Sequence, residues 1–214
     1  EYKSSTIERR IGLRLAHHKL ASIAEYAALT EREPEELRSL AQSMLIGVTS
    51  FFRDPAVWEL LVKVSLPGLL ESAPAGGTLR AWVPACSTGE EAYTVAILLL
   101  EALEDLPASH RPLLRIFATD VDPEAIATAR LGLYPLSIAA QISAVRLKRH
   151  FTQEAQQYRL RKSVRDLIVF AQHDLISDPP FTRMDLLTCR NLMIYLTGEL
   201  QQKLVRVFHY SLNV

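Results

Sequence analysis

Charged and polar side chains gather in four short stretches of the sequence, each placed directly after a run of apolar residues. The stretches read ACSTGEE at 85–91, ATDVD at 118–122, HDL at 173–175 and CRN at 189–191. The apolar runs have the length and composition of buried strands, and ligands in open α/β sheets bind beyond the carboxyl ends of the strands. The four stretches could therefore contribute to one binding site.

The acids in these stretches indicate the chemistry of the ligand. An acid that ends the second strand commonly binds ribose hydroxyls, so Asp120 is a candidate nucleoside ligand and Asp122 is its rival. The first turn has a single glycine, Gly89, in place of the G-x-G-x-x-G pattern that binds a dinucleotide. A nucleoside that carries positive charge and no phosphate would suit Glu90 and Glu91. S-adenosylmethionine, with its sulfonium and ammonium groups, fits this description.

A purely structural interpretation exists for the same residues. Ser87-x-x-Glu90 and Thr88-x-x-Glu91 both match the capping box, which satisfies the backbone at the start of a helix. The arginine and asparagine of the CRN stretch could cap a strand end or pair with acids. Cys189 could be a small buried apolar residue. These alternatives stay open when each stretch is taken singly.

The stretch MLIGVTSFFRDP at 44–55 combines apolar, basic and turn-forming residues. In the structural interpretation Phe51 and Phe52 belong to the core and Arg53 is merely exposed. Asp54 followed by Pro55 is a suitable N-cap and first position for a helix over the next segment, AVWELLVKV.

From residue 78 the pattern alternates between strands and helices, which predicts a parallel sheet with helices on its faces. Strands are predicted at 79–86, 114–120, 167–175 and 184–191. Helices are predicted at 90–106, from 123, around 136–149 and at 198–211, and a small hairpin with a basic rim at 151–167. Two helices, 3–20 and 34–46, are predicted in the N-terminal part.

Composition excludes several classes of protein. The 24 basic and 24 acidic side chains balance, so no overall field attracts nucleic acid. No apolar run reaches the roughly 18 residues that cross a bilayer, so direct membrane insertion is not expected. The two cysteines have no motif spacing and no secretory cleavage pattern is present, so a cytoplasmic location is expected. No metal site is predicted.

The N-terminal helix carries a basic stripe beside an apolar edge. Helical spacing places Lys3, Arg10, Arg14 and His17 on the stripe and Ile7, Ile11 and Leu15 on the edge. The stripe could bind an acidic partner, or it could be an ordinary solvated helix face.

Taken in order, MLIGVTSFFRDP at 44–55, CSTGEEAYT at 86–94, FATDVD at 117–122, HDL at 173–175 and DLLTCRNLMIYL at 185–196 resemble the CheR-type chemoreceptor glutamate methyltransferases. The resemblance covers nearly the whole chain. It is greatest for the methyltransferase segment of hybrid sensor proteins that also carry a methylesterase module.

The resemblance implies an α/β fold of the class I S-adenosylmethionine-dependent (Rossmann-like) methyltransferase type. A small all-α N-terminal lobe is expected at 1–45, and a connecting segment with a cofactor-contacting motif and a helix at 46–77. The methyltransferase domain is expected at 78–214, with an antiparallel β-subdomain inserted at about 151–166. The family continues beyond HYSLNV, the last residues of this chain, into a C-terminal strand hairpin, which is expected to be missing here and to leave the chain's own activity open.

The resemblance also assigns roles by motif position. It implies a cofactor pocket lined by Thr49, Arg53, Ala85, Glu91, Asp120, Asp174, Leu175, Arg190 and Asn191. It implies that Arg53, Arg190 and Tyr195 act as catalytic residues on the reacting groups, and that the N-terminal basic stripe contacts the partner. Many members of the family have asparagine where Gly47 and Asp174 stand.

The expected function is therefore S-adenosylmethionine-dependent formation of glutamate γ-methyl esters on chemoreceptor cytoplasmic helices, with S-adenosylhomocysteine as product. The expected partner is the cytoplasmic domain of a methyl-accepting chemotaxis receptor, and fused methylesterase and sensor domains are an open option. One alternative is a non-catalytic regulatory module that binds S-adenosylmethionine or S-adenosylhomocysteine. Another is a methyltransferase for small molecules or RNA, whose RNA form is disfavoured by the zero net charge.

Overall fold

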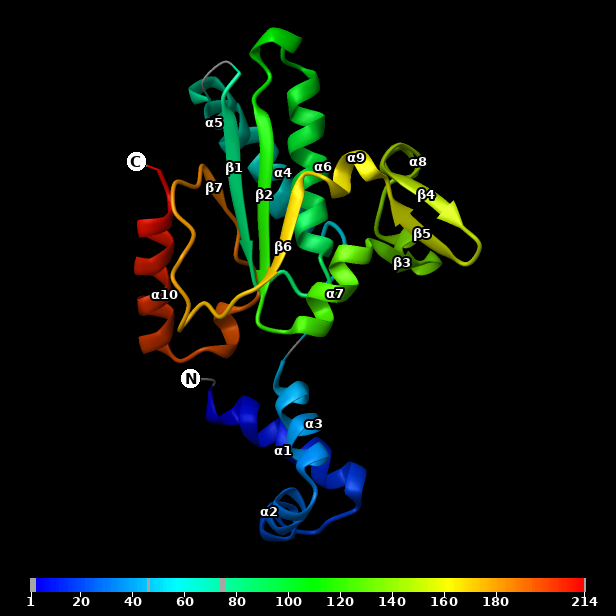
Figure 1. Ribbon diagram of the computed structural model, residues 1–214, viewed down its shortest axis with the longest axis vertical. Coiled ribbons are helices and arrows are strands. Elements are labelled where there is room, and N and C mark those ends of the chain that lie inside the picture. The colour runs from blue at the N-terminus through cyan, green and yellow to red at the C-terminus, as the bar shows by residue number, and fades with distance from the viewer. Residues whose placement is uncertain (1–2, 46, 74–75, 214) are drawn as a thin grey trace. The chain divides into compact units, whose positions relative to one another are not determined.

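The computed structural model describes residues 3–45, 47–73 and 76–213 (Figure 1). The chain divides into two compact units. Unit 1 comprises residues 1–47 and 191–205, and unit 2 comprises residues 48–190 and 206–214. In the described part of the chain, no helix combines the length and the apolar character needed to span a membrane.

Unit 1 is helical. Its elements are α1 (Ser4–His18), α2 (Ile23–Arg32), α3 (Pro34–Met44), a short 3-10 turn (Met193–Tyr195) and the first part of α10 (Gly198–Ser211). The sequence predicted α1 and α3 but not α2. The start of α2 carries a signal that could have revealed it: the hydroxyl of Ser22 accepts the backbone N–H of Glu25, and the Glu25 carboxylate accepts the N–H of Ala21.

A buried carboxylate holds the first three helices together. The Glu36 side chain in α3 is 5% exposed and accepts hydrogen bonds from Arg14 in α1 and from the Tyr26 hydroxyl in α2. His18 Nε2 lies 2.8 Å from the same carboxylate. The hydrogen bond from Arg14 is the main cause that lowers the pKa of Glu36 to about 2, against the opposing effect of burial.

The side chains of the basic stripe predicted on α1 differ in their exposure and in their partners. Arg14 points to Glu36, and the Lys3 ammonium, just before α1, donates to the carbonyl of Ile194 at 2.8 Å. Arg10 is half-buried, and His17 is exposed. A role of these four side chains in partner binding stays a prediction, with Arg14 already engaged inside unit 1.

Replacing Glu36 by glutamine is expected to destabilise the α1–α3 part of unit 1 by about 3 kcal/mol, because Arg14 then loses its buried counter-ion. Glu35 is the matched control, since its side chain is 83% exposed and pairs with an Arg38 that is 75% exposed. Glu35→Gln should cost less than about 0.5 kcal/mol. Amide hydrogen exchange in α3 measures both effects, and equal protection in the two variants would contradict the assignment.

Unit 2 is built on the predicted parallel sheet. Its strand order is β6-β2-β1-β7, formed by β1 (Thr78–Pro84), β2 (Leu113–Asp120), β6 (Ile168–Gln172) and β7 (Leu186–Leu187). The prediction of a parallel α/β sheet is confirmed. Strand β1 is central, and its apolar side chains are almost fully buried, which matches the continuous apolar run of a strand covered on both faces.

Strand β7 is shorter than the predicted strand at 184–191. At its start the Asp185 carboxylate accepts the backbone N–H of Arg80 at 2.7 Å, so a side chain takes the place of a ladder partner. The backbone of Met184 pairs with residues 211–213 through hydrogen bonds from its N–H to Ser211 and from the Asn213 N–H to its carbonyl. The segment just before β7 therefore has a short parallel neighbour within unit 2.

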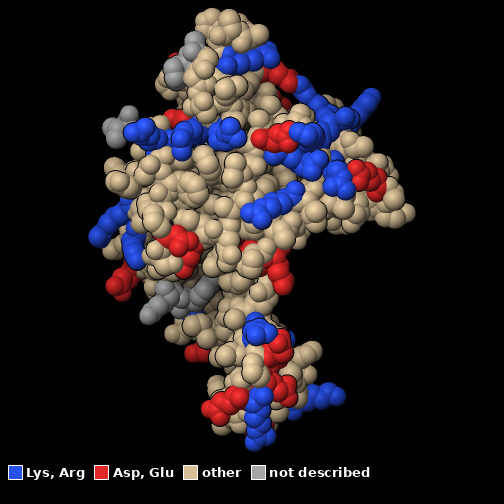
Figure 2. Space-filling model, in the orientation of Figure 1, with Lys and Arg blue, Asp and Glu red and all other residues tan. Residues whose placement is uncertain are grey.

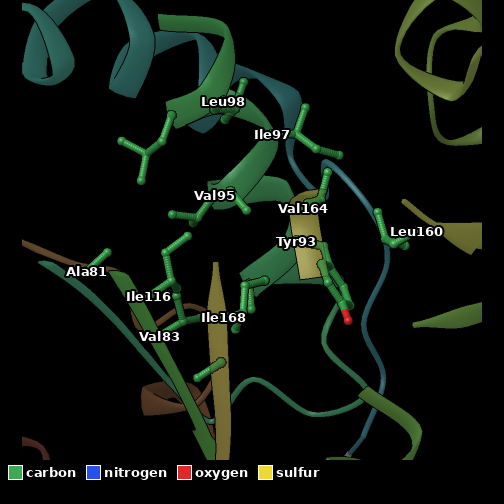
Figure 3. Close-up of a cluster of buried hydrophobic side chains, with 14 of the residues drawn as sticks. Ala81, Val83, Tyr93, Val95, Ile97, Leu98, Ile116, Leu160, Val164 and Ile168 are labelled. Atoms are coloured by element: carbon green, nitrogen blue, oxygen red, sulfur yellow. The ribbon is translucent and has the colours of Figure 1, made fainter. Parts of the chain in front are cut away.

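Helices cover the sheet in unit 2. They are α4 (Pro55–Leu60), a π-helical turn (Leu61–Ser65), α5 (Leu66–Ser72), α6 (Glu90–Glu104), α7 (Pro123–Leu131) and short 3-10 turns at Ala108–His110 and Leu136–Ala140. Helix α6 is buried along residues 92–99, which explains its almost uniformly apolar sequence. Figure 3 shows Tyr93 and Val95 of α6 in one apolar cluster with Ile116 of β2 and Ile168 of β6.

A small antiparallel sheet, order β3-β5-β4, adjoins these helices. It consists of β3 (Leu133–Pro135), β4 (Phe151–Glu154) and β5 (Gln157–Leu160). Helix α8 (Ala144–His150) lies between β3 and β4 in the chain, and α9 (Lys162–Arg165) follows β5. The structure thus adds β3 to the predicted hairpin. It also divides the helix predicted at 136–149, because the Ser143 side chain caps a new helix start.

The basic rim of this small sheet is largely paired. Arg146 binds Glu101 at 2.7 Å, and Arg149 binds Glu104. Arg159 pairs with Glu154, and Lys162 pairs with Asp166. In Figure 2, Lys and Arg side chains accordingly lie beside Asp and Glu side chains near α9. The rim is therefore a mixed-charge surface.

Candidate functional site

The parallel sheet brings the predicted ligand-binding stretches to one edge. Strand order places the ends of β6, β2, β1 and β7 in a row, and all four strands run in the same direction. Backbone hydrogen bonds continue past the strands: His173 donates to Asp120, Cys86 to Thr119 and Thr188 to Trp82, at 2.9 to 3.0 Å. Each of the four stretches therefore begins beside its neighbour.

The turn after β1 is tightly folded. Ala85 and Ser87 have left-handed backbone, with φ of 54° and 50°, and Gly89 has φ of 98°. The N–H of Ser87 donates to Asp120 Oδ2 at 2.8 Å, which fastens the turn to the end of β2. A Cβ atom at Gly89 would lie 2.9 Å from Cβ of Ala129, so this glycine allows α6 to pack against α7.

The capping-box interpretation of the two glutamates is wrong. Helix α6 begins at Glu90, and the residue in the cap position is Gly89, which has no side chain to accept a hydrogen bond. The Glu90 carboxylate instead accepts the hydroxyl of Thr88 at 2.7 Å. Burial raises the pKa of Glu90, and the Thr88 hydrogen bond opposes that effect.

Glu91 lies among cationic and polar side chains. Its Oε2 is 3.9 Å from Arg190 Nη1, and its Oε1 is buried without a hydrogen-bond partner among the described residues. Thr188 Oγ1, another buried atom, also makes no hydrogen bond of ordinary geometry there, but it lies near enough to the Glu91 carboxylate to stabilise its charge. Burial raises the pKa of Glu91, while Thr188, Arg190 and Arg53 act in the opposite direction. A buried carboxylate with one oxygen that lacks a hydrogen bond is suited to a cationic or N–H-bearing ligand.

The Phe-Phe-Arg segment is anchored to α6 and α4. The backbone N–H of Phe52 donates to the Thr94 hydroxyl at 3.1 Å, and the indole N–H of Trp58 donates to the carbonyl of Arg53 at 2.8 Å. Phe51 and Phe52 are 2% and 8% exposed, so their assignment to the core is confirmed. Arg53 is half-buried and donates to the carbonyl of Val48 at 2.8 Å.

Arg190 follows β7 and reaches the same place. Its Nη2 donates to Asp54 Oδ2 at 2.6 Å, and its guanidinium lies over the Trp58 ring at 4.7 Å from the ring centre. Together with Glu91, these contacts make a cluster of two arginines and two acids. Sequence reasoning assigned Glu91, Arg53 and Arg190 to the site but gave neither Asp54 nor Trp58 a role in it.

Asp120 and Asp122 have different hydrogen-bond partners in the structure. Asp122 Oδ1 accepts the N–H groups of Glu124 and Ala125 and thereby caps α7. The Asp120 carboxylate accepts the N–H groups of Ser87 and Asp122 at the junction of the β1 and β2 ends. Burial raises the pKa of Asp120, and these N–H groups oppose it. Asp120 is therefore the acid fixed in the row of strand ends.

Asp174 is committed to the loop after β6. Its Oδ1 accepts the N–H of Ile176 at 2.8 Å and its Oδ2 accepts the Ser177 hydroxyl at 2.9 Å. The Ile176 N–H is the main cause that lowers the pKa of Asp174. Leu175 is the next residue of this turn and is half-buried. The carboxylate of Asp174 thus shapes the loop, and its contact with a cofactor stays a prediction.

The remaining predicted site residues are Thr49, Asn191 and Tyr195. Thr49 precedes the Phe-Phe-Arg segment and is half-buried. Asn191 and Tyr195 belong to unit 1, where the Tyr195 carbonyl accepts the backbone N–H of Lys3 at 3.0 Å. Burial, with a contribution from Glu91, raises the pKa of Cys189 to about 12. Its thiol is protonated at neutral pH, in line with the structural interpretation of this cysteine.

Non-glycine residues with left-handed backbone concentrate in the motif segments. Phe52, Asp54, Ala85, Ser87 and Asn191 have φ between 50° and 61°. Such a conformation costs on the order of 1 kcal/mol or more for each residue and persists where the surrounding structure holds it. Backbone strain is therefore built into three of the segments that carry the predicted site residues.

Two protein-family models match the chain. Residues 47–214 match the model described as "CheR methyltransferase, SAM binding domain", and residues 1–45 match the one described as "CheR methyltransferase, all-alpha domain". The chain belongs to the CheR methyltransferase family. The resemblance stated from the sequence motifs is confirmed, and so is the expected S-adenosylmethionine-dependent methyltransferase fold.

Individual relatives agree with this assignment. The CheR-family chain is 34% identical over 211 residues to chemotaxis protein methyltransferase 2 of Pseudomonas aeruginosa, covering 96% of the chain and 72% of that protein. It is 31% identical over 212 residues to the chemotaxis protein methyltransferase of Listeria monocytogenes, covering 99% of the chain and 78% of that protein.

A longer relative has higher identity. An uncharacterized 104.1 kDa protein of Rhodobacter capsulatus is 45% identical over 213 residues, which cover 100% of the chain and 22% of that protein. The CheR-family chain thus spans less than a quarter of this relative. A solved S-adenosylmethionine-dependent methyltransferase from Mesorhizobium loti is also similar, at 19% identity over 69% of the chain and 48% of its own, with a TM-score of 0.34.

The residues of the CheR-family site fit S-adenosylmethionine. The unpartnered oxygen of Glu91 is buried and could accept a hydrogen bond from the ligand's ammonium or attract its positively charged sulfonium. Asp120 stands at the strand end where a carboxylate binds ribose hydroxyls, and each of its oxygens keeps a second lone pair. The buried hydroxyl of Thr188 is a further polar contact. The first turn offers carboxylates where a dinucleotide would need a phosphate-binding loop.

Glu91→Gln is expected to raise the dissociation constant for S-adenosylmethionine about tenfold, the effect of losing roughly 1.4 kcal/mol of charge pairing. Isothermal titration calorimetry measures it. Glu90→Gln is the matched control, because a neutral amide oxygen can still accept the Thr88 hydrogen bond. Unchanged affinity in the Glu91 variant, or equal losses in both variants, would refute the assignment.

The affinity for S-adenosylmethionine should also depend on pH. Ionised Glu91 attracts a cation and protonated Glu91 does not, and burial raises the pKa of this group above the ordinary value of 4.5. As the pH falls from neutrality, the dissociation constant should therefore begin to rise before that value is reached. Glu91→Gln should remove this part of the dependence. A wild-type affinity that stays flat down to pH 4.5 would contradict the argument.

Proposed function

We propose that this chain transfers the methyl group of S-adenosylmethionine to glutamate side chains on the cytoplasmic helices of chemoreceptors and forms γ-methyl esters there. Membership of the CheR methyltransferase family supports the reaction class. The observation that carries the proposal is the pairing of opposite charges at one place. Glu91 offers a carboxylate for the cationic cofactor, and Arg53 and Arg190 offer guanidinium groups for an anionic acceptor.

The acceptor needs little chemical activation. A glutamate side chain has an ordinary pKa of roughly 4 to 5, so at neutral pH it is already ionised and nucleophilic without a general base. Bound S-adenosylmethionine supplies a methyl group on a positively charged sulfur. The chain's own task is to align the acceptor and exclude water, and alignment can account for a large part of a rate enhancement.

Each proposed catalytic residue has a role in that alignment. Arg190 and Arg53 hold one oxygen of the acceptor carboxylate through charge-assisted hydrogen bonds, and the other oxygen stays free to attack. The Tyr195 hydroxyl fixes the direction of the carboxylate. The hold must be moderate, because strong pairing makes a carboxylate a poorer nucleophile.

The proposed partner is the cytoplasmic domain of a methyl-accepting chemotaxis receptor. The two chemotaxis methyltransferase relatives support this choice. On α1, the stripe of Lys3, Arg10, Arg14 and His17 remains the proposed receptor contact, with Arg10 and His17 its more available members, since Lys3 and Arg14 have partners in unit 1. The small share of the Rhodobacter capsulatus protein that the chain matches supports a place within a larger sensor protein, with methylesterase and sensor modules as its proposed neighbours.

A labelling experiment tests the proposal. The full-length protein that contains this chain is incubated with S-adenosylmethionine carrying a labelled methyl group and with receptor cytoplasmic fragments. Label should appear on the receptor and should be released by mild base, as a carboxyl methyl ester requires. Arg190→Gln should lower the incorporation strongly. Label that resists base would indicate a nitrogen or carbon acceptor, and binding without any transfer would indicate a regulatory module.

A further inference from the structure

The guanidinium of Arg190 is held from three directions. Its Nη2 donates to Asp54 Oδ2 at 2.6 Å, and its Nη1 lies 3.9 Å from Glu91 Oε2. Its face covers the ring of Trp58 at 4.7 Å, within the range of a cation–π contact. The ring restrains the plane of the guanidinium, the hydrogen bond to Asp54 restrains its rotation within that plane, and Glu91 adds an electrostatic attraction at the other end. These contacts leave the side chain 14% exposed.

Asp54 does not perform the structural role that its position suggests. It occupies the N-cap of α4, where an aspartate ordinarily accepts a backbone N–H of the first turn, but its side chain makes no capping hydrogen bond. Its backbone is left-handed, with φ of 53°. A strained backbone and an uncapped helix both cost free energy, and the contact that the carboxylate makes in return is the ion pair with Arg190.

Trp58 connects both arginines of the cluster. Its indole N–H donates to the carbonyl of Arg53, and its ring lies under Arg190. The side chain is 4% exposed, so it is a fixed part of the core and a rigid support. Since Asp54 and Trp58 lie four residues apart at the start of α4, one short helix supplies two of the three contacts of Arg190.

We infer that Asp54 and Trp58 are positioning residues that hold the Arg190 guanidinium in a fixed orientation for the acceptor carboxylate. This inference rests on the proposed function for its consequence in catalysis. The positioning itself concerns contacts of Arg190 alone, so it can be measured without any methyl transfer.

The first measurement follows the Arg190 side chain by NMR on the full chain. Held by the hydrogen bond to Asp54 and by the Trp58 ring, the guanidinium should show slow rotation and separately resolved Nη resonances. Asp54→Asn should average these resonances, because the charge-assisted bond is lost from an exposed residue whose replacement leaves the core intact. Glu59→Gln is the matched control. It removes one acid from the same helix, but the partner of Glu59 is Lys63.

Substitutions of Trp58 test the ring. Trp58→Phe keeps a ring face under Arg190 and should retain most of the restriction, whereas Trp58→Leu should lose it. Resonances in Asp54→Asn that match the wild type would overturn the role of Asp54. Equal behaviour of the phenylalanine and leucine variants, with Asp54→Asn also unchanged, would overturn the inference as a whole.

The second measurement is receptor methylation by the same variants. Asp54→Asn should lower kcat/KM for the receptor about tenfold, because a less ordered arginine aligns the acceptor poorly. The thermal unfolding midpoint of Asp54→Asn and the activity of Glu59→Gln should stay near wild type, since Asp54 is 58% exposed. A merely structural defect would instead lower the unfolding midpoint, and that result would count against positioning. Absence of methylation by the wild type would refute the proposed function, and the NMR result would still decide whether Arg190 is positioned.

Discussion

An ionised carboxylate is costly to bury unless a cation lies close by, and this constraint at Glu91 organises the rest of the site. The carboxylate stands at the first turn of a helix whose following residues are buried, and its side chain is only 13% exposed to water. Arg190 lies near one of its oxygens, and the other has no partner among the described residues. The site therefore has acceptor capacity in reserve for a positively charged ligand.

The fold brings opposite charges to this carboxylate from distant parts of the sequence. Arg190 lies three residues after β7, and Asp54 and Trp58 lie at the start of α4, more than 130 residues earlier in the chain. Parallel pairing of β1 with β7 positions Arg190, and the hydrogen bond from Phe52 to Thr94 of α6 positions the segment with Asp54. The proposed catalysis relies on the alignment of the acceptor carboxylate. That alignment depends on the attachment of β7 to β1 and on the attachment of the Phe-Phe-Arg segment to α6.

The sequence predicted the sheet well because parallel strands are continuous apolar runs, and the acids and arginine after them mark the strand ends. It predicted α10 with the bounds that the structure has. It missed α2, a short helix marked by little more than Ser22 and Glu25, and it overestimated β7, where the Asp185 side chain replaces a ladder partner. Local patterns carry no information on such tertiary substitutions.

The limits of prediction were similar at the site. Strand-end logic and family motifs brought out Glu91, Arg53 and Arg190, because each lies at a fixed offset from a recognisable stretch. Nothing local distinguishes Asp54 from an ordinary helix cap, or Arg14 from a surface cation, since the partner of each is distant in sequence. Residue type gives the charge, but only packing decides which opposite charge it meets.

The aromatic packing of Phe51 joins the small antiparallel sheet to the Phe-Phe-Arg segment. Its ring meets Tyr134 of β3 at 4.9 Å and Phe151 of β4 at 5.5 Å, and its backbone N–H donates to the Gln141 side chain. Two residues further along the chain is Arg53. The small antiparallel sheet thus packs directly on the segment that carries one arginine of the charged cluster, and the position of that segment depends on this sheet as well as on α6.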